Sequence, residues 1–276
     1  MSEAMIRRGV SMGEYLALDA ASASLLHVLA TQTPMHAYAY MTEPREDTRA
    51  LIRGEATHYA ILEPELFDLR YAEPPQGDAR TVACKAEWAA WKIAYPESVG
   101  IKHDDYVAAK GMNIAVRAHP EAMRFIAGAG MNEVTVTWTD EETGELCKAR
   151  PDRVAGVGGR TWIVDIKTCR SASAFMFSRA VADYGYHQKA AWYLDALDRI
   201  EKRPRRFLFL AVESEPPHAV ALYELTDEAI EQGRRENRVA LALLAECKRT
   251  KTWPGYSTEI QYLDLPRWKQ KEMENA

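Results

Sequence analysis

The fold is decided by two segments, Arg150-Pro151-Asp152-Arg153 and Thr161-Trp162-Ile163-Val164-Asp165-Ile166-Lys167, in which twelve residues separate Asp152 from Asp165. The β-branched residues before Asp165 predict a strand. Alternate side chains of a strand lie on one face, so we expect Asp165 and Lys167 to point to the same side of a sheet. Asp152, at the end of the neighbouring strand, can reach the same point. The two segments therefore predict two carboxylates and an ammonium at one end of a sheet.

This constellation has the composition of a site for a hard divalent cation. Carboxylates and backbone carbonyl oxygens are ligands that Mg²⁺ prefers. We expect Asp152 and Asp165, with the carbonyl of Ile166, to bind Mg²⁺ or Mn²⁺. We expect Lys167 to orient an attacking water or to neutralise charge that develops on a phosphate. Such a site would hydrolyse phosphodiester bonds, whereas the alternative interpretation is a salt-bridged strand end at the surface.

The D/E-x-K spacing alone has little specificity, because a chain of this length contains about one or two examples by chance. Glu246-Cys247-Lys248 has the same spacing, but it falls in a predicted helix, where residues i and i+2 do not share a face. The segment at Asp165 differs because a strand precedes it, a Pro-Asp pair lies upstream and a helix follows. This context favours a functional site.

The remaining sequence predicts an α/β (α+β) fold, with a central mixed sheet flanked by helices and a helical segment at the N-terminus. Apolar periodicity and turn residues predict the boundaries. The expected helices cover 12–42 with a break at Pro34, 46–62, 85–95, 103–128 with breaks at Gly111 and Pro120, 172–183, 185–199 and 226–247, and Pro64 and 74–78 are expected in loops. The expected strands cover 133–139, 145–150, 161–167, 206–212 and 219–223, and 151–159 is expected as a short segment with a turn. No long linker is evident, so we expect one domain over 1–276, with a core over 10–250 and a tail over 251–276.

Composition and charge exclude several classes of protein. The chain has 276 residues, of which 47% are hydrophobic, and a net charge of -5. This composition is not that of a disordered, collagen-like or disulfide-dense protein. No apolar run is long enough for a spanning helix, and the N-terminus lacks the apolar core of a secretory signal. We therefore expect a soluble, cytoplasmic protein without a membrane partner, and the acidic balance is weak evidence against nucleic acid.

The four cysteines indicate ordinary thiols. Cys84, Cys147, Cys169 and Cys247 lie at least 22 positions apart, without a C-x-x-C pair. A structural zinc site needs closer ligands, and so does the alternative of a four-cysteine iron–sulfur cluster.

Pro151-Asp152 and Asp165-Ile166-Lys167 together resemble the motif of the PD-(D/E)xK nuclease superfamily. Further segments resemble the nuclease domain of exonuclease VIII (RecE) and its phage and prophage relatives, namely residues 22–26 before Pro34, 50–58, 150–153 and 207–223. The resemblance covers roughly residues 10–250. It implies a restriction-endonuclease-like core and a metal-dependent exonuclease that degrades one strand of linear duplex DNA from a 5′ end. It also implies a ring-like homo-oligomer around DNA and the use of the 3′ single strand in recombination, where a single-strand annealing protein is an expected partner.

The resemblance also implies roles for individual residues. Asp152 and Asp165 match the metal-binding acids, and Lys167 matches the catalytic lysine. His58, in a G-x-x-x-H pattern, matches a histidine that reaches the metal site from a helix. The alternative for His58 is a hydrogen-bonded core histidine.

A glutamine on the helix after the D-x-K strand belongs to the same pattern, and Gln188 matches it as a residue that fixes the lysine or the DNA end. In the family a tyrosine follows this glutamine by four positions. Here Trp192 stands at four positions and Tyr193 at five.

Other polar residues have two interpretations each. Glu133 could lend a carboxylate to the metal site or be a solvated strand end, and Glu213 is a weaker candidate of the same kind. Thr168 could bond a phosphate or simply end the strand. Arg150 and Arg153 could pair with Asp152 or contact DNA. The basic clusters at 202–206 and 248–251 could bind phosphates or be solvated faces, and the tail at 266–271 could be disordered or contact a neighbouring subunit.

Three rival functions remain open at this point: an endonuclease or single-strand nuclease, a DNA-binding protein of the same fold without activity, and a metal-dependent phosphoesterase that acts on small molecules.

Overall fold

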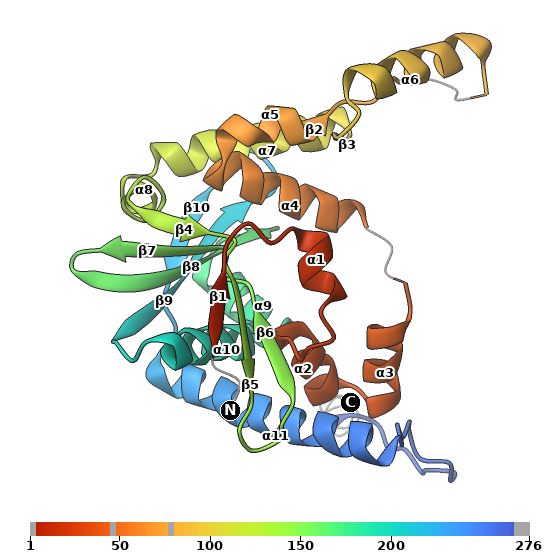
Figure 1. The fold of residues 1–276 in the computed structure, drawn as a ribbon, viewed down its shortest axis with the longest axis vertical. Helices are drawn as coiled ribbons and strands as arrows, with labels where there is room; N and C mark the ends of the chain where they lie inside the picture. The colour runs from red at the N-terminus through yellow and green to blue at the C-terminus, as the bar shows by residue number, and fades with distance from the viewer. Residues whose placement is uncertain (1–3, 45–47, 77–79, 268–276) are drawn as a thin grey trace, which may run out of the picture.

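A computed structural model describes residues 4–44, 48–76 and 80–267 (Figure 1). The first two residues of the helix expected at 46–62, the Gly77-Asp78 end of the expected loop and residues 268–271 of the tail lie outside these ranges.

A five-stranded mixed sheet forms the centre of the molecule, which confirms the predicted fold class. Its strands stand in the order β10-β9-β8-β7-β4. Only β8 and β9 run parallel, and the other neighbouring strands of this sheet are antiparallel. The bounds are β4 Gly130–Asn132, β7 Arg153–Val157, β8 Arg160–Cys169, β9 Arg205–Glu213 and β10 Val220–Tyr223.

Two smaller sheets accompany the central one. A three-stranded antiparallel sheet consists of β1 Met5–Arg7, β5 Thr135–Thr139 and β6 Leu146–Ala149, in the order β1-β5-β6. A parallel pair consists of β2 Tyr71–Ala72 and β3 Val99–Gly100.

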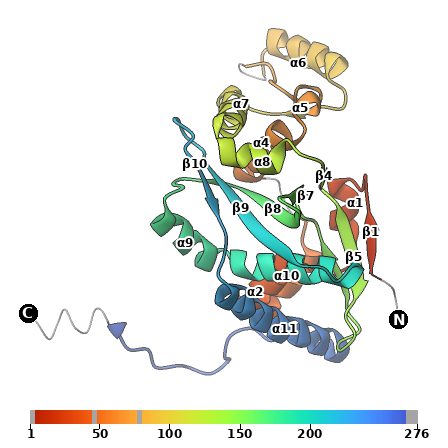
Figure 2. The same cartoon turned by 90° about the vertical axis from the view of Figure 1, so that its left-hand side faces the viewer.

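Helices cover both faces of the central sheet (Figure 2). One face is packed mainly by α2 Ala23–Thr31, α9 Ala174–Asp183, α10 Tyr186–Ile200 and α11 Asp227–Thr250. The other is packed by α4 Arg49–Leu62, α7 His103–Ala118 and α8 Pro120–Ile126. The remaining helices are α1 Met12–Ala17, α3 Pro34–Thr42, α5 Pro64–Arg70 and α6 Val82–Ala94, and α6 projects from the body in Figure 1.

Side-chain alternation along β8 assigns each residue to one of these faces. Ile163 belongs to the apolar cluster that contains α10, whereas Val164 and Ile166 belong to the cluster that contains α7 and α8. Because the strand has a period of two, Asp165 and Lys167 lie on the α10 face, as predicted. Asp165 stands opposite Phe209 of β9, in the middle of the parallel pair.

The structure corrects several predicted boundaries. Residues 151–159 include a full strand, β7, which forms a hairpin with β8. The segment 12–42 forms three helices, α1, α2 and α3. Pro64, which was expected in a loop, begins α5, because proline is well accommodated in the first helical turn. The break at Pro120 is confirmed, but α7 continues through Gly111. A Cβ at Gly111 would lie 2.6 Å from Nε2 of His218, so this glycine provides room for a side chain to cross the helix.

The four cysteines are free thiols, as expected. Within the described residues, no helix combines the length and apolar character that crossing a bilayer requires.

Candidate metal centre

Asp152 is fixed by the two strands that the sequence singled out. It directly precedes β7, whose first residue, Arg153, is paired with Val164 of the antiparallel β8, so Asp152 lies beside the middle of β8. Its side chain is buried, and its Oδ2 accepts a hydrogen bond of 2.8 Å from the backbone N–H of Ile166. Its backbone carbonyl accepts one of 2.9 Å from the N–H of Glu133. Asp152 therefore joins β8 to the segment before β5.

Three ligand-type side chains from separate segments meet at this point: His58 of α4, Glu133 and Asp152, whose ligand atoms all lie within 4.8 Å of one another. Nδ1 of His58 is 4.0 Å from Oε1 of Glu133, and Nε2 is 3.7 Å from Oδ2 of Asp152. The same Nε2 lies 3.0 Å from the carbonyl oxygen of Ile166. The structure thus brings together His58, Asp152 and the Ile166 carbonyl, three of the four predicted donors, with Glu133, for which the sequence left a metal ligand and a solvated strand end as alternatives.

The local backbone directs Glu133 into the group. Its φ is 48°, in the left-handed region that side-chain-bearing residues rarely adopt. Its Oε2 accepts a hydrogen bond of 2.7 Å from Nε of Arg150. Burial raises the pKa of the Glu133 carboxyl, the Asp152 carboxylate adds to this shift, and His58 and Arg150 oppose it. A backbone conformation that is held by its surroundings beside a second carboxylate is typical of a functional site.

The donor set fits a divalent cation. Two carboxylates and a backbone carbonyl supply hard oxygen atoms, which suit Mg²⁺. The imidazole nitrogen adds a donor that Mn²⁺ accepts as well. A cation there would also relieve the repulsion between Glu133 and Asp152.

Asp165 lies outside this group of three, and the ammonium groups of two lysines lie beside its carboxylate. Its carboxylate is completely buried, with Lys167 on Oδ2 and Nζ of Lys189 2.7 Å from Oδ1. Burial alone would raise the pKa of the Asp165 carboxyl, but the two ammoniums outweigh burial and lower it. Burial lowers the pKa of the Lys167 ammonium, Asp165 opposes this shift and Lys189 adds to it. Asp165 was predicted as a metal ligand beside Asp152, and the structure places it in an ion pair with Lys167 and Lys189 next to the group of three.

The side chain of Gln188 contacts helix α2 and not Lys167. Its Oε1 lies 2.7 Å from Nδ1 of His27 on α2, so its side chain lies against α2. The next residue, Lys189, faces Asp165 instead, and its Nζ lies 5.2 Å from the ring centre of Tyr193. In this chain a tyrosine follows Lys189 by four positions, whereas none follows Gln188 at that distance, so Lys189 and Tyr193 have the spacing that the family pattern has between its glutamine and tyrosine. That spacing is the signal by which the sequence could have identified Lys189.

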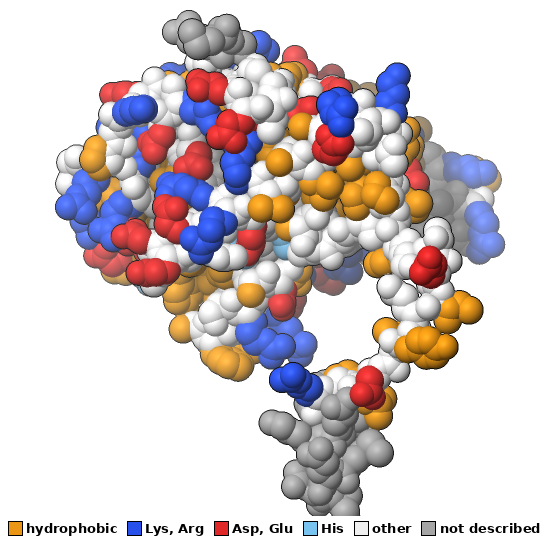
Figure 3. Space-filling view, turned by 90° about the horizontal axis from the view of Figure 1, so that it is seen from below, with side chains coloured by type: hydrophobic (Ala, Val, Ile, Leu, Met, Phe, Trp, Pro, Cys, Tyr) orange, Lys and Arg blue, Asp and Glu red, His pale blue; other side chains and the backbone are white. Residues whose placement is uncertain are grey.

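The other polar candidates have structural partners. Oε1 of Glu213 accepts a hydrogen bond of 2.9 Å from the N–H of Ala172. Arg150 pairs with Glu133, and Nε of Arg153 donates to the carbonyl of Phe125 at 2.7 Å. In the two basic clusters, five of the cations pair with acids, namely Arg203 with Glu201, Arg205 with Asp198, Arg206 with Glu224, Lys248 with Glu145 and Arg249 with Glu246. Acidic and basic side chains alternate in the same way across the lower face of the molecule (Figure 3).

A pocket of about 910 Å³ lies beside the carboxyl end of β8. Thr168 and Tyr186 line it, and Nζ of Lys167 lies 4.9 Å from the ring centre of Tyr186, so the pocket adjoins the site. Its lining also includes Arg170 and Arg179, which are exposed and lie within ion-pair distance of no carboxylate in the described part of the chain. Its other basic side chains are Arg49 and Arg53, which contact the buried Asp105.

Comparison with known proteins places this geometry in a family. A family model described as "PDDEXK-like domain of unknown function (DUF3799)" matches residues 22–266. A crystal structure of a "putative exonuclease" from Eubacterium rectale is similar with a TM-score of 0.65 and 13% identity, over 96% of this chain and 98% of that chain. A second solved structure, of SSO0001, has a TM-score of 0.28 at 14% identity, over 78% of this chain and 84% of that one. No curated protein matches the chain.

Proposed function

Because the chain belongs to this PDDEXK-like family, we propose that it is a metal-dependent deoxyribonuclease that degrades linear double-stranded DNA from its ends. The observation that carries the proposal is the convergence of His58, Glu133 and Asp152 next to the Asp165–Lys167 pair. The fold that it shares with the Eubacterium rectale protein agrees with this function.

We propose that His58, Glu133, Asp152 and the carbonyl of Ile166 hold Mg²⁺ or Mn²⁺. A bound divalent ion would polarise the scissile phosphate and promote deprotonation of a water molecule. The chain itself fixes the donors in advance. Asp152 is held by the N–H of Ile166, and Glu133 is held by Arg150.

Lys167 would act on the water and on the phosphate. Its side chain is 12% exposed, and Asp165 holds its ammonium at the edge of the site. A cation that is fixed in this way can orient an attacking water and neutralise charge that develops on the phosphate, without reorganising during the reaction. Asp165 contributes by positioning this ammonium. For Gln188, the contact with His27 supports a role in seating α10 on α2.

The pocket next to Tyr186 would receive the DNA strand. Arg170 and Arg179 present cations that no described carboxylate neutralises, and such cations bind phosphates with a salt-dependent affinity. The resemblance to exonuclease VIII supports 5′ to 3′ polarity, a ring-like homo-oligomer and a single-strand annealing partner in recombination.

The experiment compares digestion of linear and covalently closed circular duplex DNA, with Mg²⁺ or with a chelator. We expect wild-type protein to degrade the linear form in Mg²⁺ and to leave the closed circle intact. Lys167→Ala should be slower by about 10²–10³, the cost of removing one fixed electrostatic contact from an active site. Lys110→Ala is the matched control, because Lys110 also pairs with an aspartate, Asp68, at 2.9 Å but lies on α7.

Equal rates for wild type and Lys167→Ala would refute the assignment. Digestion of the closed circle at the same rate as the linear form would show an endonuclease instead. A salt-insensitive protein without affinity for duplex DNA that hydrolyses small phosphodiesters would support the phosphoesterase alternative.

A further inference from the structure

Helix α6 has an apolar face that the described part of the chain leaves open to solvent. Val82, Ala86, Ala89 and Ile93 are spaced by four, three and four positions, so they lie on one face of the helix. All four are exposed, and Val82 and Ile93 keep 85% and 82% of their surface accessible. The acid of this helix, Glu87, lies outside the face. We call these four residues the α6 apolar face.

The other side of α6 already has packing partners. The ring centre of Trp91 lies 5.6 Å from that of Trp88 and 5.7 Å from that of Tyr95. A Cβ at Gly100 of β3 would lie 3.7 Å from the Trp91 ring, so the aromatic side faces the rest of the protein. A helix of 13 residues is only marginally stable in water by itself. Further packing can therefore stabilise α6 through its apolar face.

The C-terminal tail carries a second uncovered apolar surface. Tyr256 packs against His36 of α3, and the chain then leaves the body (Figure 2). Ile260, Tyr262 and Leu263 follow within a few residues, and each is at least 92% exposed. Large apolar side chains that gather at the surface in this way mark a site of protein interaction.

The two surfaces match in charge and in length. Lys85 and Lys92 border the α6 apolar face along one edge, whereas Glu259 and Asp264 flank the apolar residues of the tail. Within the described ranges, none of these four side chains lies within ion-pair distance of an opposite charge. Residues 259–264 span about 20 Å when they are extended. The 13 residues of α6 also span about 20 Å.

The tail does not cover α6 of its own chain, because the two lie at opposite ends of the molecule in both ribbon views (Figures 1 and 2). A contact between them therefore joins two copies. Two different surfaces meet in it, so the contact is heterologous and repeats from copy to copy until it closes into a ring or continues as a filament.

We propose that residues 259–264 of one copy dock along the α6 apolar face of a second copy, with Glu259 and Asp264 facing Lys85 and Lys92. The partner that this surface fits is thus an acidic, apolar, extended segment, and the chain supplies that segment itself. The proposal goes beyond the proposed function and does not depend on it, because no residue of the metal centre takes part.

The test exchanges the charges and measures self-association by sedimentation velocity over a range of protein concentrations. We expect the wild type to associate. Lys85→Glu with Lys92→Glu makes both surfaces acidic, and Glu259→Lys with Asp264→Lys makes both basic. Like charges across an interface are costly, so each double variant alone should associate with a dissociation constant raised by at least about tenfold. An equimolar mixture of the two double variants restores opposite charges at every contact and should associate as the wild type does.

Arg160→Glu with Lys202→Glu is the matched control. Both are exposed cations without a carboxylate within ion-pair distance in the described chain, and they lie outside α6 and the tail. This variant changes the net charge by the same amount and should associate as the wild type does. Ile260→Ser with Tyr262→Ser removes apolar contact without a change of charge, in a segment that leaves the body, and should also weaken association.

A wild type that stays monomeric at every concentration would overturn the inference. Undiminished association of both charge variants would overturn it too, because it would place the contact elsewhere on the molecule. A mixture that associates no better than its components would refute the pairing of the tail with α6. Absence of nuclease activity from a wild type that associates as described would refute the proposed function and leave this inference intact.

Discussion

Replacing Glu133 by glutamine separates metal binding from folding, because the two carboxylates of the centre repel each other when no metal is bound. Ligand atoms of Glu133 and Asp152 lie within 4.8 Å of each other. At this distance two unit charges repel by roughly 3.5 kcal/mol at an effective dielectric constant of 20 and by about 0.9 kcal/mol in water. Arg150, 2.7 Å from Glu133, offsets part of this repulsion. An amide oxygen can still accept the hydrogen bond from Arg150, so we expect Glu133→Gln without metal to be within about 1 kcal/mol of the wild type, or slightly more stable.

Metal should reverse this order. An ion present at a hundred times its dissociation constant stabilises the folded state by about 2.7 kcal/mol. For a chain of this size, about 1 kcal/mol shifts the midpoint of thermal unfolding by roughly 2–4 °C. The wild type should therefore gain about 5–10 °C from saturating Mg²⁺ or Mn²⁺. Glu133→Gln should lose most of that gain, because it removes one of the two carboxylates among the three side-chain donors.

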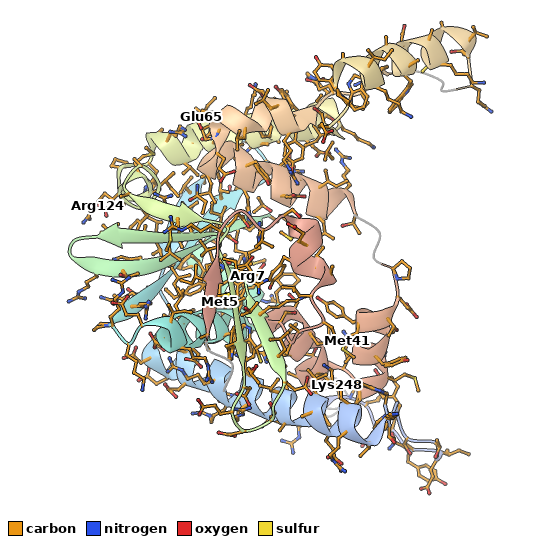
Figure 4. All side chains as sticks on the ribbon, viewed as in Figure 1. Met5, Arg7, Met41, Glu65, Arg124 and Lys248 are labelled. Atoms are coloured by element: carbon orange, nitrogen blue, oxygen red, sulfur yellow. The ribbon has the colours of Figure 1, made fainter. Side chains whose placement is uncertain are left out.

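The assay is thermal unfolding with a chelator and with a series of Mg²⁺ and Mn²⁺ concentrations. Glu145→Gln is the matched control. Glu145 is also a partly buried glutamate, and a cation, Lys248 of α11, lies 2.7 Å from it. Helix α11 lies on the opposite side of the molecule from α4, which carries His58 (Figures 1 and 4). This control should keep the full metal-induced shift. An equal shift in Glu133→Gln and the wild type would refute the assignment of Glu133 to the centre, and a large loss of stability in chelator would refute the repulsion.

Three further predictions concern the DNA pocket and the frame around it. Replacing both Arg170 and Arg179 by alanine should weaken the binding of duplex DNA in chelator and reduce the slope of log affinity against log salt by about 2. Fluorescence anisotropy measures both quantities, and an unchanged slope would contradict the proposed phosphate contacts. Burial alone would raise the pKa of Asp140, but Arg238 and other hydrogen-bond donors lower it to about 2. The Asp140 carboxylate therefore stabilises the fold above about pH 4, and this stabilisation is lost as the pH falls toward 2. Asp140→Asn should cost about 2 kcal/mol in urea denaturation at neutral pH and flatten the acid-induced loss, and a wild-type acid profile would exclude this contribution. Gly185→Ala should lower the free energy of unfolding by about 1–3 kcal/mol, because Gly185 has a φ of 63° and a Cβ there would lie 2.2 Å from Nδ1 of His27 on α2. An unchanged denaturation midpoint would contradict this clash.

Local patterns were sufficient to predict the main elements and half of the centre. The alternation along 161–167 and the Pro-Asp pair upstream place Asp152 and Asp165 at one sheet end, and β7 and β8 bring them together there. The sequence predicts only a short segment with a turn where β7 stands, because the five residues of β7 include a glycine and are followed by Gly158-Gly159. Only pairing with β8 on one side and β4 on the other makes this short run a strand.

The residues that sequence reasoning underestimated are those whose role depends on tertiary packing. Glu133 reaches the centre through a left-handed backbone conformation and the carbonyl of Asp152, and neither leaves a periodic signal. Lys189 and Gln188 are adjacent on one helix, so a shift of about 100° decides which of them faces Asp165. The seating of α10 on α2, through His27, makes that choice.

The net charge of -5 first weighed against a nucleic-acid substrate, and the distribution of charge now resolves that objection. On α11, the cations Arg234, Arg238 and Arg249 pair with nearby acids, so the outer face offers little unbalanced positive charge. Arg170 and Arg179 are different because they line the pocket beside Lys167 without a carboxylate partner in the described ranges. A duplex would therefore find its attractive field at the mouth of the site, where the phosphate to be cut must arrive. An acidic surface with a basic entrance would disfavour binding of DNA along the outside of the protein, which agrees with the proposed degradation from DNA ends.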